Sequence, residues 1–351
     1  MNKKNIIVLF GGQSSEHEIS CISAKTIMEN IDLDKYNIYP VGITKEGNWR
    51  LYEGVIKDIA DDKWVKDSVN AIISPDATDK SLLVFKDKNV EKINIDIVFP
   101  ALHGLYGEDG SVQGLLELAG IPYVGCGILA SSVSMDKLFT KIIVDTLGIR
   151  QARYKAVHKK DMDEIKIVVD KIEKEFDYPI FIKPSNAGSS KGITKAHNRG
   201  ELFDGLELGI KHDSKLLIEE TIVGRELECA VLGNYHPKTT NIGEIISAGE
   251  FYDYDAKYND EGSKTIINPE LPKDIVKQIK NNAEDIFKAV DGRGLARADF
   301  FLEEKTGEVV FNEINTLPGF TGISMYPMLW EDKGMPIKQL IDKLINFALN
   351  K

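Results

Sequence analysis

Cysteine is scarce in this sequence, and long apolar runs are missing. Its three cysteines, Cys21, Cys126 and Cys229, are widely spaced among 351 residues. Neither a disulfide framework nor a zinc-binding spacing fits them, so we expect buried free thiols in a reducing cytoplasm. No apolar stretch approaches the roughly 20 residues that cross a bilayer, so we expect no membrane partner. The apolar segment beginning at residue 6 leads directly into a glycine turn, which predicts a first strand and not a signal peptide.

Positive charge is scarce relative to negative charge. The chain carries 55 acidic and 44 basic residues, a net charge of −11. A general nucleic-acid binder needs a basic surface, so this balance argues against a nucleic-acid partner. Hydrophobic residues make up 42% and charged residues 28%, which is typical of a globular protein. A chain of this length is expected to form two or three domains.

Strand-like and helix-like segments alternate along the chain, the pattern of an α/β protein. Residues 6–10 and 93–100 are apolar runs typical of buried parallel strands. Beyond residue 220 the expected strands alternate apolar and polar residues, as in an antiparallel sheet with one wet face. We therefore predict a mostly parallel N-terminal domain over 1–127, a small central domain over 128–221 and an antiparallel-rich C-terminal domain over 222–351.

The residues of three further segments indicate two helices and one long loop. Apolar residues at helical spacing predict a helix near 163–176 and another over 337–349. Residues 249–269 are polar and aromatic and have no periodicity. Loops of about 20 residues inside a compact domain are usually lids or binding loops, so we expect a lid there.

Two expected strands between residues 295 and 315 carry the most informative side chains. Alternation places Arg297 and Asp299 on one face of the first strand, and Glu313 and Asn315 on one face of the second. If the two faces coincide, two carboxylates and an amide supply oxygens to one point. Mg²⁺ selects such ligands when nucleotide phosphates complete its shell. The alternative is a surface ladder of charges in which Arg297 pairs with Asp299.

A loop of small residues follows Lys183 and extends to Gly192. Such loops wrap phosphate oxygens, because backbone N–H dipoles converge without side chains in the way. This is not a Walker A loop, since the lysine precedes the glycines and no Gly-Lys-Ser opens a helix. The alternative is a flexible surface loop.

Acidic residues and one histidine at strand ends complete the candidates. Glu219 and Glu220 end an apolar strand and Glu226 follows, where a carboxylate suits the ribose hydroxyls or the amino group of a nucleotide. A solvated strand end is the alternative. Glu16 either favours the dipole of the first helix, worth ~0.3–1 kcal/mol, or receives a substrate ammonium. His103 stands at the carboxyl end of an expected strand, the usual ligand side of such sheets.

In this order and combination, the motifs resemble those of D-alanine–D-alanine ligases of the ATP-grasp superfamily along the whole chain. The motifs that carry the resemblance are GGQSSEHEIS (11–20), HGLYGEDGSVQG (103–114), GCGILASSVSMDK (125–137), KPSNAGSSKG (183–192), IEE (218–220), GRELECAVLG (224–233), FYDYDAKY (251–258), ARADFF (296–301) and NEINTLPGFTGISMYP (312–327).

The resemblance implies an ATP-grasp fold and a cytoplasmic, ADP-forming ligase that makes D-alanyl-D-alanine through an acyl phosphate, for peptidoglycan synthesis. It implies ATP, two Mg²⁺ ions with Mn²⁺ as a substitute, D-alanine as substrate, and a homodimer. The implied metal ligands are Asp299, Glu313 and Asn315. The implied nucleotide-binding residues are Lys137, Lys183, Ser190, Glu219, Glu220, Glu226 and Lys257.

The remaining implied residues serve the two amino acids and the reacting carbonyl. Glu16 takes the first ammonium with help from Ser189 and the lid residue Tyr258, and His103 lies nearby. Arg297 and the Gly319 N–H are implied to stabilise the oxyanion. Ser324 and Met325 are implied to receive the carboxylate and the side chain of the second D-alanine.

Other functions stay open as alternatives. A ligase for D-lactate would replace the lid tyrosine, so Tyr258 argues against it. A D-alanine–D-serine ligase would be expected to place a polar or charged residue at Met325, whose apolar side chain suits a methyl group. Glu16 and the 312–327 segment disfavour other ATP-grasp ligases. A non-catalytic nucleotide-binding module would have no use for Arg297 beside a metal site.

Overall fold

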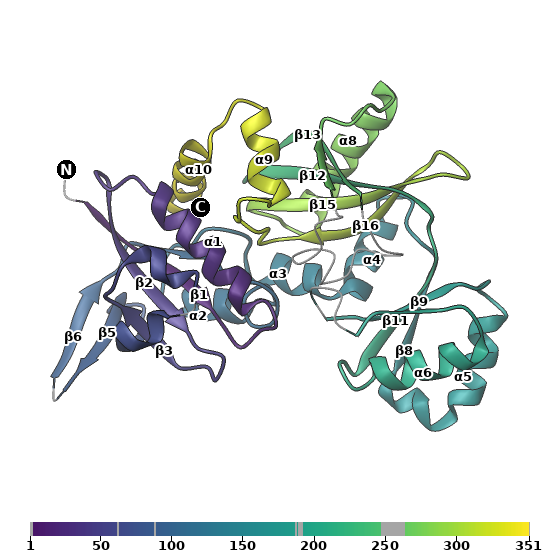
Figure 1. The fold of residues 1–351 in the computed structure, drawn as a ribbon, viewed down its shortest axis with the longest axis horizontal. Coiled ribbons are helices and arrows are strands. Elements are labelled where there is room, and N and C mark those ends of the chain that lie inside the picture. The colour runs from purple at the N-terminus through teal and green to yellow at the C-terminus, as the bar shows by residue number, and fades with distance from the viewer. Residues whose placement is uncertain are drawn as a thin grey trace.

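The described residues form three β-sheets with helices packed against them (Figure 1). The computed structural model of the protein describes residues 3–61, 63–87, 89–186, 188, 192–246 and 264–350. The N-terminal sheet is seven-stranded and has the order β6-β5-β4-β3-β2-β1-β7. Its strands are β1 (Lys4–Gly11), β2 (Tyr36–Ile43), β3 (Trp49–Tyr52), β4 (Ser68–Ile73), β5 (Ser81–Lys86), β6 (Asn89–Asn94) and β7 (Ile97–Pro100).

The N-terminal sheet is mixed, which corrects the prediction of a mostly parallel one. Parallel pairing among these strands is confined to β1 with its neighbours β2 and β7. The strands from β2 to β6 pair antiparallel in chain order. The connections β2–β3, β4–β5 and β5–β6 are too short for a parallel pair, which needs a long crossover. The longer segment between β3 and β4 also returns the chain antiparallel. The segment expected as one strand over 93–100 is divided between β6 and β7. The α/β fold class is confirmed.

The C-terminal helices pack against the N-terminal part of the chain. Helix α10 (Ile337–Leu349) contacts both α1 (His17–Asn30) and β7, and Figure 1 shows it beside α1. Helix α9 (Met325–Asp332) joins the same apolar cluster, which also includes Ala230 and Leu295 of the C-terminal sheet. The first and last parts of the chain therefore share one core.

A small sheet with its own core lies in the middle of the chain. Its order is β10-β9-β11-β8, and every pairing is antiparallel. The strands are β8 (Tyr154–His158), β9 (Ile180–Pro184), β10 (Thr194–Ala196) and β11 (Lys215–Glu220). The predicted helix near 163–176 is α5 (Ile165–Glu173), and α6 (Arg199–Gly209) packs beside it (Figure 1). The core of this sheet draws on residues between 157 and 218.

The C-terminal sheet is antiparallel throughout its described strands, as predicted. Its order is β14-β13-β12-β15-β16, and α8 (Lys273–Ala289) packs against it. The strands are β12 (Gly224–Gly233), β13 (Lys238–Ile246), β14 (Lys264–Ile267), β15 (Gly294–Glu303) and β16 (Val309–Asn315).

Helices α3 (Ile128–Met135) and α4 (Lys137–Asp145) bear on the predicted boundary at residue 128. Ala130 and Val144 are buried in the same cluster as Phe300 and Phe311 of the C-terminal sheet. The small sheet has a separate cluster. We therefore propose that the central domain begins after α4, near residue 150, and that α3 and α4 belong with the C-terminal sheet.

Truncation of Leu344 in α10 tests the shared core. Leu344 is fully buried, so Leu344→Ala should lower the free energy of unfolding by about 2–5 kcal/mol through the cavity it leaves. Gln339 is exposed on the same helix, and Gln339→Ala should change stability by no more than about 0.5 kcal/mol. Chemical denaturation measures both. Equal, small effects would contradict the packing of α10 into this core.

Candidate active site

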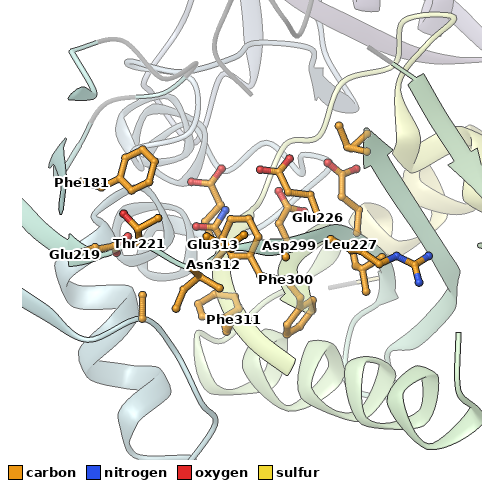
Figure 2. A pocket seen from close by; sticks show the side chains of 18 of the residues that line it. Phe181, Glu219, Thr221, Glu226, Leu227, Asp299, Phe300, Phe311, Asn312 and Glu313 are labelled. Carbon is orange, nitrogen blue, oxygen red and sulfur yellow. The ribbon is translucent and has the colours of Figure 1, made fainter. Parts of the chain in front are cut away.

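A cavity of about 610 Å³ lies between the small sheet and the C-terminal sheet. This volume is within the range of ligand-binding pockets. Figure 2 shows Phe181, Glu219 and Thr221 at one end and Glu226 and Leu227 at the other, with other charged groups between them. Its charged lining residues include Lys137, Lys183, Glu219, Glu226, Glu228, Arg297, Asp299 and Glu313.

The pairing of β15 with β16 brings the predicted metal ligands together. Arg297 lies opposite Asn315, and Asp299 lies opposite Glu313. The two predicted faces therefore coincide over this stretch. Asp299 and Glu313 both line the cavity, and Figure 2 shows both carboxylates on the same side of it.

A β-bulge interrupts the same pair of strands one residue later. Phe300 pairs with Phe311, so Asn312 is the extra residue on β16. Phe311 is buried and packs edge-on against Phe300, with ring centroids 5.7 Å apart. Phe300, Phe311, Asn312 and Glu313 all line the cavity. The bulge thus separates the apolar floor of the site from its polar groups.

Arg297 is held between two carboxylates in the cavity. Its Nε and Nη2 donate to the two oxygens of Asp299 at 2.8 and 2.7 Å, and Nε also lies 3.1 Å from Glu228 Oε2. Burial acts to lower the pKa of Arg297, but the carboxylates of Asp299 and Glu228 raise it well above its ordinary range. Arg297 does pair with Asp299, as in the surface-ladder alternative, but its side chain is only 17% exposed, so the pair lies in the cavity and not on the surface.

Glu219 is held between two lysines at the other end of the cavity. Its Oε2 lies 2.6 Å from Lys183 Nζ, and its Oε1 lies 2.9 Å from Lys141 Nζ. Burial acts to raise the pKa of Glu219, but the two ammonium groups lower it to about 2. Sequence reasoning missed Lys141. Its position, one turn after Lys137 in α4, does not by itself distinguish it from an exposed lysine.

Lys137 and the start of the glycine-rich loop are tied together. The Lys137 N–H donates to Ser185 O at 2.9 Å, and Asp136 Oδ1 accepts from Ser185 Oγ at 2.7 Å. Asp136 also caps α4 by accepting from two of its backbone N–H groups. Lys137 Nζ lies 3.3 Å from Glu313 Oε2. Two lysines predicted to hold phosphates, Lys137 and Lys183, therefore enter one cavity.

The Glu220 side chain binds arginines. Its Oε1 accepts from the Arg153 backbone N–H at 2.8 Å, and its Oε2 accepts from Arg153 Nε at 2.7 Å. Arg150 Nη1 donates to the same Oε1 at 3.2 Å. The carboxylate thus joins β11 to the segment before β8, which leaves its backbone as the part suited to a nucleotide.

Glu16 lies where the turn after β7 meets the glycine-rich loop. A Cβ built on Gly188 would stand 2.9 Å from Glu16 Oε2, and one built on Gly104 would stand 2.7 Å from it. Both glycines are needed for this close approach. Glu16 stands at the N-cap of α1, but its carboxylate makes no capping hydrogen bond to that helix.

His103 braces two loops of the site. Its Nδ1 lies 3.1 Å from Leu317 O, and its Nε2 lies 3.1 Å from Ser23 Oγ. Ser23 Oγ also accepts from the Phe320 N–H at 3.2 Å. Burial acts to lower the pKa of His103, but Glu108, 3.5 Å away, raises it above its ordinary value. Sequence reasoning missed Ser23, which a helical pattern cannot distinguish from any buried serine.

The loop before α9 brings Gly319 and Ser324 together. Ser324 Oγ accepts from the Thr321 N–H at 2.9 Å, and a Cβ on Gly319 would stand 2.8 Å from that Oγ. Met325 is 3% exposed, and its sulfur lies against Gly243 of β13. The Met325 side chain is therefore part of the core beneath the loop.

Four predicted site residues lie outside the described residues. They are Ser189, Ser190, Lys257 and Tyr258. Most of the predicted lid, 249–269, also falls there, and its role stays a prediction. None of the helices in the described ranges has the length and apolar character needed to span a bilayer.

Known proteins resemble this chain along its whole length. The family model "D-ala D-ala ligase N-terminus" matches residues 5–126, and "D-ala D-ala ligase C-terminus" matches residues 143–346. The D-alanine–D-alanine ligase of Acetivibrio thermocellus is 50% identical, covering 100% of this chain and 97% of the relative. That of Caldicellulosiruptor bescii is 51% identical, covering 100% of this chain and 96% of the relative.

Solved structures of other proteins also resemble this chain along its whole length. VanG D-Ala:D-Ser ligase from Enterococcus faecalis superposes with a TM-score of 0.90 at 38% identity, covering 99% of this chain and 100% of that one. The D-alanine–D-alanine ligase from Coxiella burnetii superposes with a TM-score of 0.84 at 35% identity, covering 100% of this chain and 95% of that one. The D-alanine–D-alanine ligase from Bacillus anthracis complexed with ATP superposes with a TM-score of 0.72 at 29% identity, covering 100% of this chain and 98% of that one.

These matches define the class as a ligase with the ATP-grasp fold. The chain belongs to the D-alanine–D-alanine ligase family. The predictions of family, fold class and enzyme are thereby confirmed.

The charge of Glu219 should make stability depend on pH. Its pKa falls from an ordinary 4.5 to about 2 on folding. Its ionised form therefore contributes on the order of 3 kcal/mol above pH 4.5, and this contribution is lost as the pH falls towards 2. Glu219→Gln should be less stable than wild type by about that amount at pH 7, and the difference should shrink between pH 4.5 and 2.

Urea denaturation across this pH range, without nucleotide, measures the difference. Glu207 is exposed on α6, so Glu207→Gln serves as the control and should change stability by no more than about 0.5 kcal/mol at each pH. A Glu219→Gln difference that is independent of pH would show that Glu219 is not stabilised as a carboxylate.

Proposed function

We propose that the cavity between the small sheet and the C-terminal sheet binds ATP and that the protein uses it to join two D-alanines into D-alanyl-D-alanine for peptidoglycan synthesis. One observation carries the assignment of the site. Two lysines suited to phosphates, two carboxylates suited to a metal ion and a buried arginine all line a single cavity. Family membership supplies the reaction.

ATP fits the distribution of charge in the cavity. Lys137 and Lys183 are suited to the phosphates, because both ammonium groups enter the space beside Asp299 and Glu313. Glu219 and Glu226 are suited to the adenosine, whose amino and hydroxyl groups donate hydrogen bonds to carboxylates. Ser190 and Lys257 are proposed to close over the phosphates, and the Glu220 backbone to border the base.

Magnesium fits the donors at the β15–β16 pair. Asp299 and Glu313 offer carboxylate oxygens, and Asn315 offers an amide oxygen that already accepts from the Leu317 N–H at 3.0 Å. In the described ranges no group of three or more His, Cys, Asp or Glu side chains could hold a metal ion. The proposed set has two carboxylates and one amide, which leaves phosphate oxygens to complete the shell. Mg²⁺, as two ions replaceable by Mn²⁺, would neutralise the transferring phosphoryl group.

The first half-reaction activates D-alanine. Glu16 holds its ammonium group, with Ser189 and the lid residue Tyr258 as proposed partners and His103 bracing the turn beside it. A carboxylate oxygen of D-alanine attacks the γ-phosphorus, the bond to the β-phosphate oxygen breaks, and ADP leaves. Lys137 and Lys183 orient the phosphates, since positioning and charge stabilisation supply most of the catalysis in phosphoryl transfer.

The second half-reaction forms the peptide bond. The amine of the second D-alanine attacks the acyl carbon, and phosphate then leaves from the tetrahedral intermediate. Arg297 and the Gly319 N–H stabilise its oxyanion, each donor contributing roughly 3–4 kcal/mol as in other systems. Ser324 receives the carboxylate of the second D-alanine. Closure of the lid excludes water, which would otherwise hydrolyse the acyl phosphate.

D-Serine is the second candidate for the acceptor. It is favoured by the similarity to the D-Ala:D-Ser ligase from Enterococcus faecalis. D-Alanine is supported by Met325, an apolar side chain buried against Gly243 at the base of the Ser324 loop. Such a position offers no hydrogen bond to a serine hydroxyl. On the family resemblance, we further propose a cytoplasmic homodimer.

Phosphate release tests the reaction. The protein should release phosphate rapidly only when ATP, Mg²⁺ and D-alanine are all present. Glu16→Gln should lower kcat/KM for D-alanine by at least ~10-fold, the usual loss with a hydrogen bond to a charged group. Arg297→Ala should lower kcat about 100-fold or more. ATP turnover that does not depend on D-alanine would contradict the assignment.

Competition between acceptors tests the choice of second substrate. With equal concentrations of D-alanine and D-serine, mass spectrometry should find D-alanyl-D-alanine as the main product. A predominance of D-alanyl-D-serine from the wild-type protein would instead establish the D-serine alternative.

A further inference from the structure

Lys141 is a buried cation that the steps above do not use. It belongs to α4, is 2% exposed, and does not line the cavity within the described part of the chain. Its Nζ lies 2.9 Å from Glu219 Oε1 and 3.4 Å from Ala152 O, and it stands 5.4 Å from the centre of the Tyr154 ring. A lysine is rarely buried to this degree unless its charge is paired.

We propose that Lys141 is a positioning residue that keeps the Glu219 carboxylate charged and oriented while nucleotide is bound, and so makes the site select adenine over guanine nucleotides. The proposal rests on the proposed function, because it requires that the nucleobase lie against Glu219. In the described part of the chain, Lys183 is the other cation in an ion pair with Glu219, and the proposed function assigns Lys183 to the phosphates.

The two lysines contact different oxygens of Glu219. Lys183 binds Oε2 from the side of the cavity, where it lines the wall, whereas Lys141 binds Oε1 from within the protein. Lys183 is 14% exposed, against 2% for Lys141. A bound nucleotide can therefore attract Lys183 without disturbing the Lys141 contact.

Nucleotide binding makes the contact with Lys141 more important. The phosphates of a nucleotide compete for the Lys183 ammonium, and Glu219 is itself only 5% exposed. A carboxylate buried there without a counter-charge would take up a proton or rotate away. Lys141 prevents both outcomes. Burial acts to raise the pKa of Glu219, and the charges of Lys141 and Lys183 both lower it.

The ionised state of Glu219 determines which base it accepts. A carboxylate only accepts hydrogen bonds, so it pairs with the exocyclic amino group of adenine. Guanine carries a carbonyl oxygen at the corresponding position, and a carboxylate repels it. A protonated Glu219 would donate to that oxygen, and discrimination would fall.

Steady-state kinetics with ATP and GTP test the proposal. Lys141→Met keeps the length and removes the charge. With saturating D-alanine and Mg²⁺, it should raise KM for ATP about tenfold, leave kcat within about twofold, and reduce the ATP/GTP ratio of kcat/KM about tenfold, as when a charged hydrogen bond is lost. Lys141→Arg should recover part of that ratio.

Lys215→Met is the matched control. Lys215 lies on β11 with Glu219, is 13% exposed, and pairs with Asp136. It should lower thermal stability while the ATP/GTP ratio stays at the wild-type value. If Lys141→Met behaves in the same way, Lys141 has a purely structural role and the proposal is overturned.

A double-mutant cycle keeps the test decisive if Lys141→Met folds poorly. Glu219→Gln and Glu219→Gln with Lys141→Met should show the same ATP/GTP ratio, because Lys141 acts only through Glu219. A further loss in the double variant would contradict the proposal. Absence of D-alanine-dependent ADP formation by the wild type would refute the proposed function itself, independently of these ratios.

Discussion

Two charged groups of the site each lie between two side chains of opposite charge, and the site depends on this pairing. Arg297 lies between Asp299 and Glu228, and Glu219 lies between Lys141 and Lys183. Burying any of these groups alone would be strongly unfavourable, and removing one partner leaves the other as an uncompensated charge. These pairs hold the buried groups Arg297, Glu219 and Lys141 in position, and preorganised charges of this kind are what electrostatic catalysis requires.

The arrangement of cores places this site at a junction. The N-terminal and C-terminal sheets share one apolar cluster, which α9 and α10 complete, whereas the small sheet has its own. The cavity lies between the small sheet and the C-terminal sheet, and Glu16 of the N-terminal part lies close to Gly188.

Local sequence patterns predicted part of this arrangement. Alternation along each strand predicted that Arg297 and Asp299 share one face of β15, and that Glu313 and Asn315 share one face of β16. The structure pairs these two faces. The face on which a strand residue lies follows from its own strand, so it can be read from the sequence. The bulge at Asn312 could not be predicted, since it exists only in the pairing of the two strands. The mostly parallel sheet was a wrong prediction because apolar runs such as 6–10 report burial on both faces, and neighbouring strands decide the direction of pairing.

Lys141 shows where pattern reasoning ends. A lysine one turn after another in a helix is usually exposed, and only the tertiary placement of Glu219 against α4 shows that this one is buried and paired. The same holds for Ser23, whose contacts to His103 and Phe320 join residues about 80 and 297 positions away. Long-range contacts of this kind leave no local signal.

Calorimetric titration of ATP with and without Mg²⁺, in the wild type and in Asp299→Asn, tests the central claim most directly. Metal ligation by the β15–β16 pair predicts that Mg²⁺ strengthens ATP binding to the wild type and that this gain is lost in the variant, while metal-free binding changes little. An Asp299→Asn protein that keeps the full gain from Mg²⁺ would show that the metal–nucleotide complex does not bind at this pair of strands.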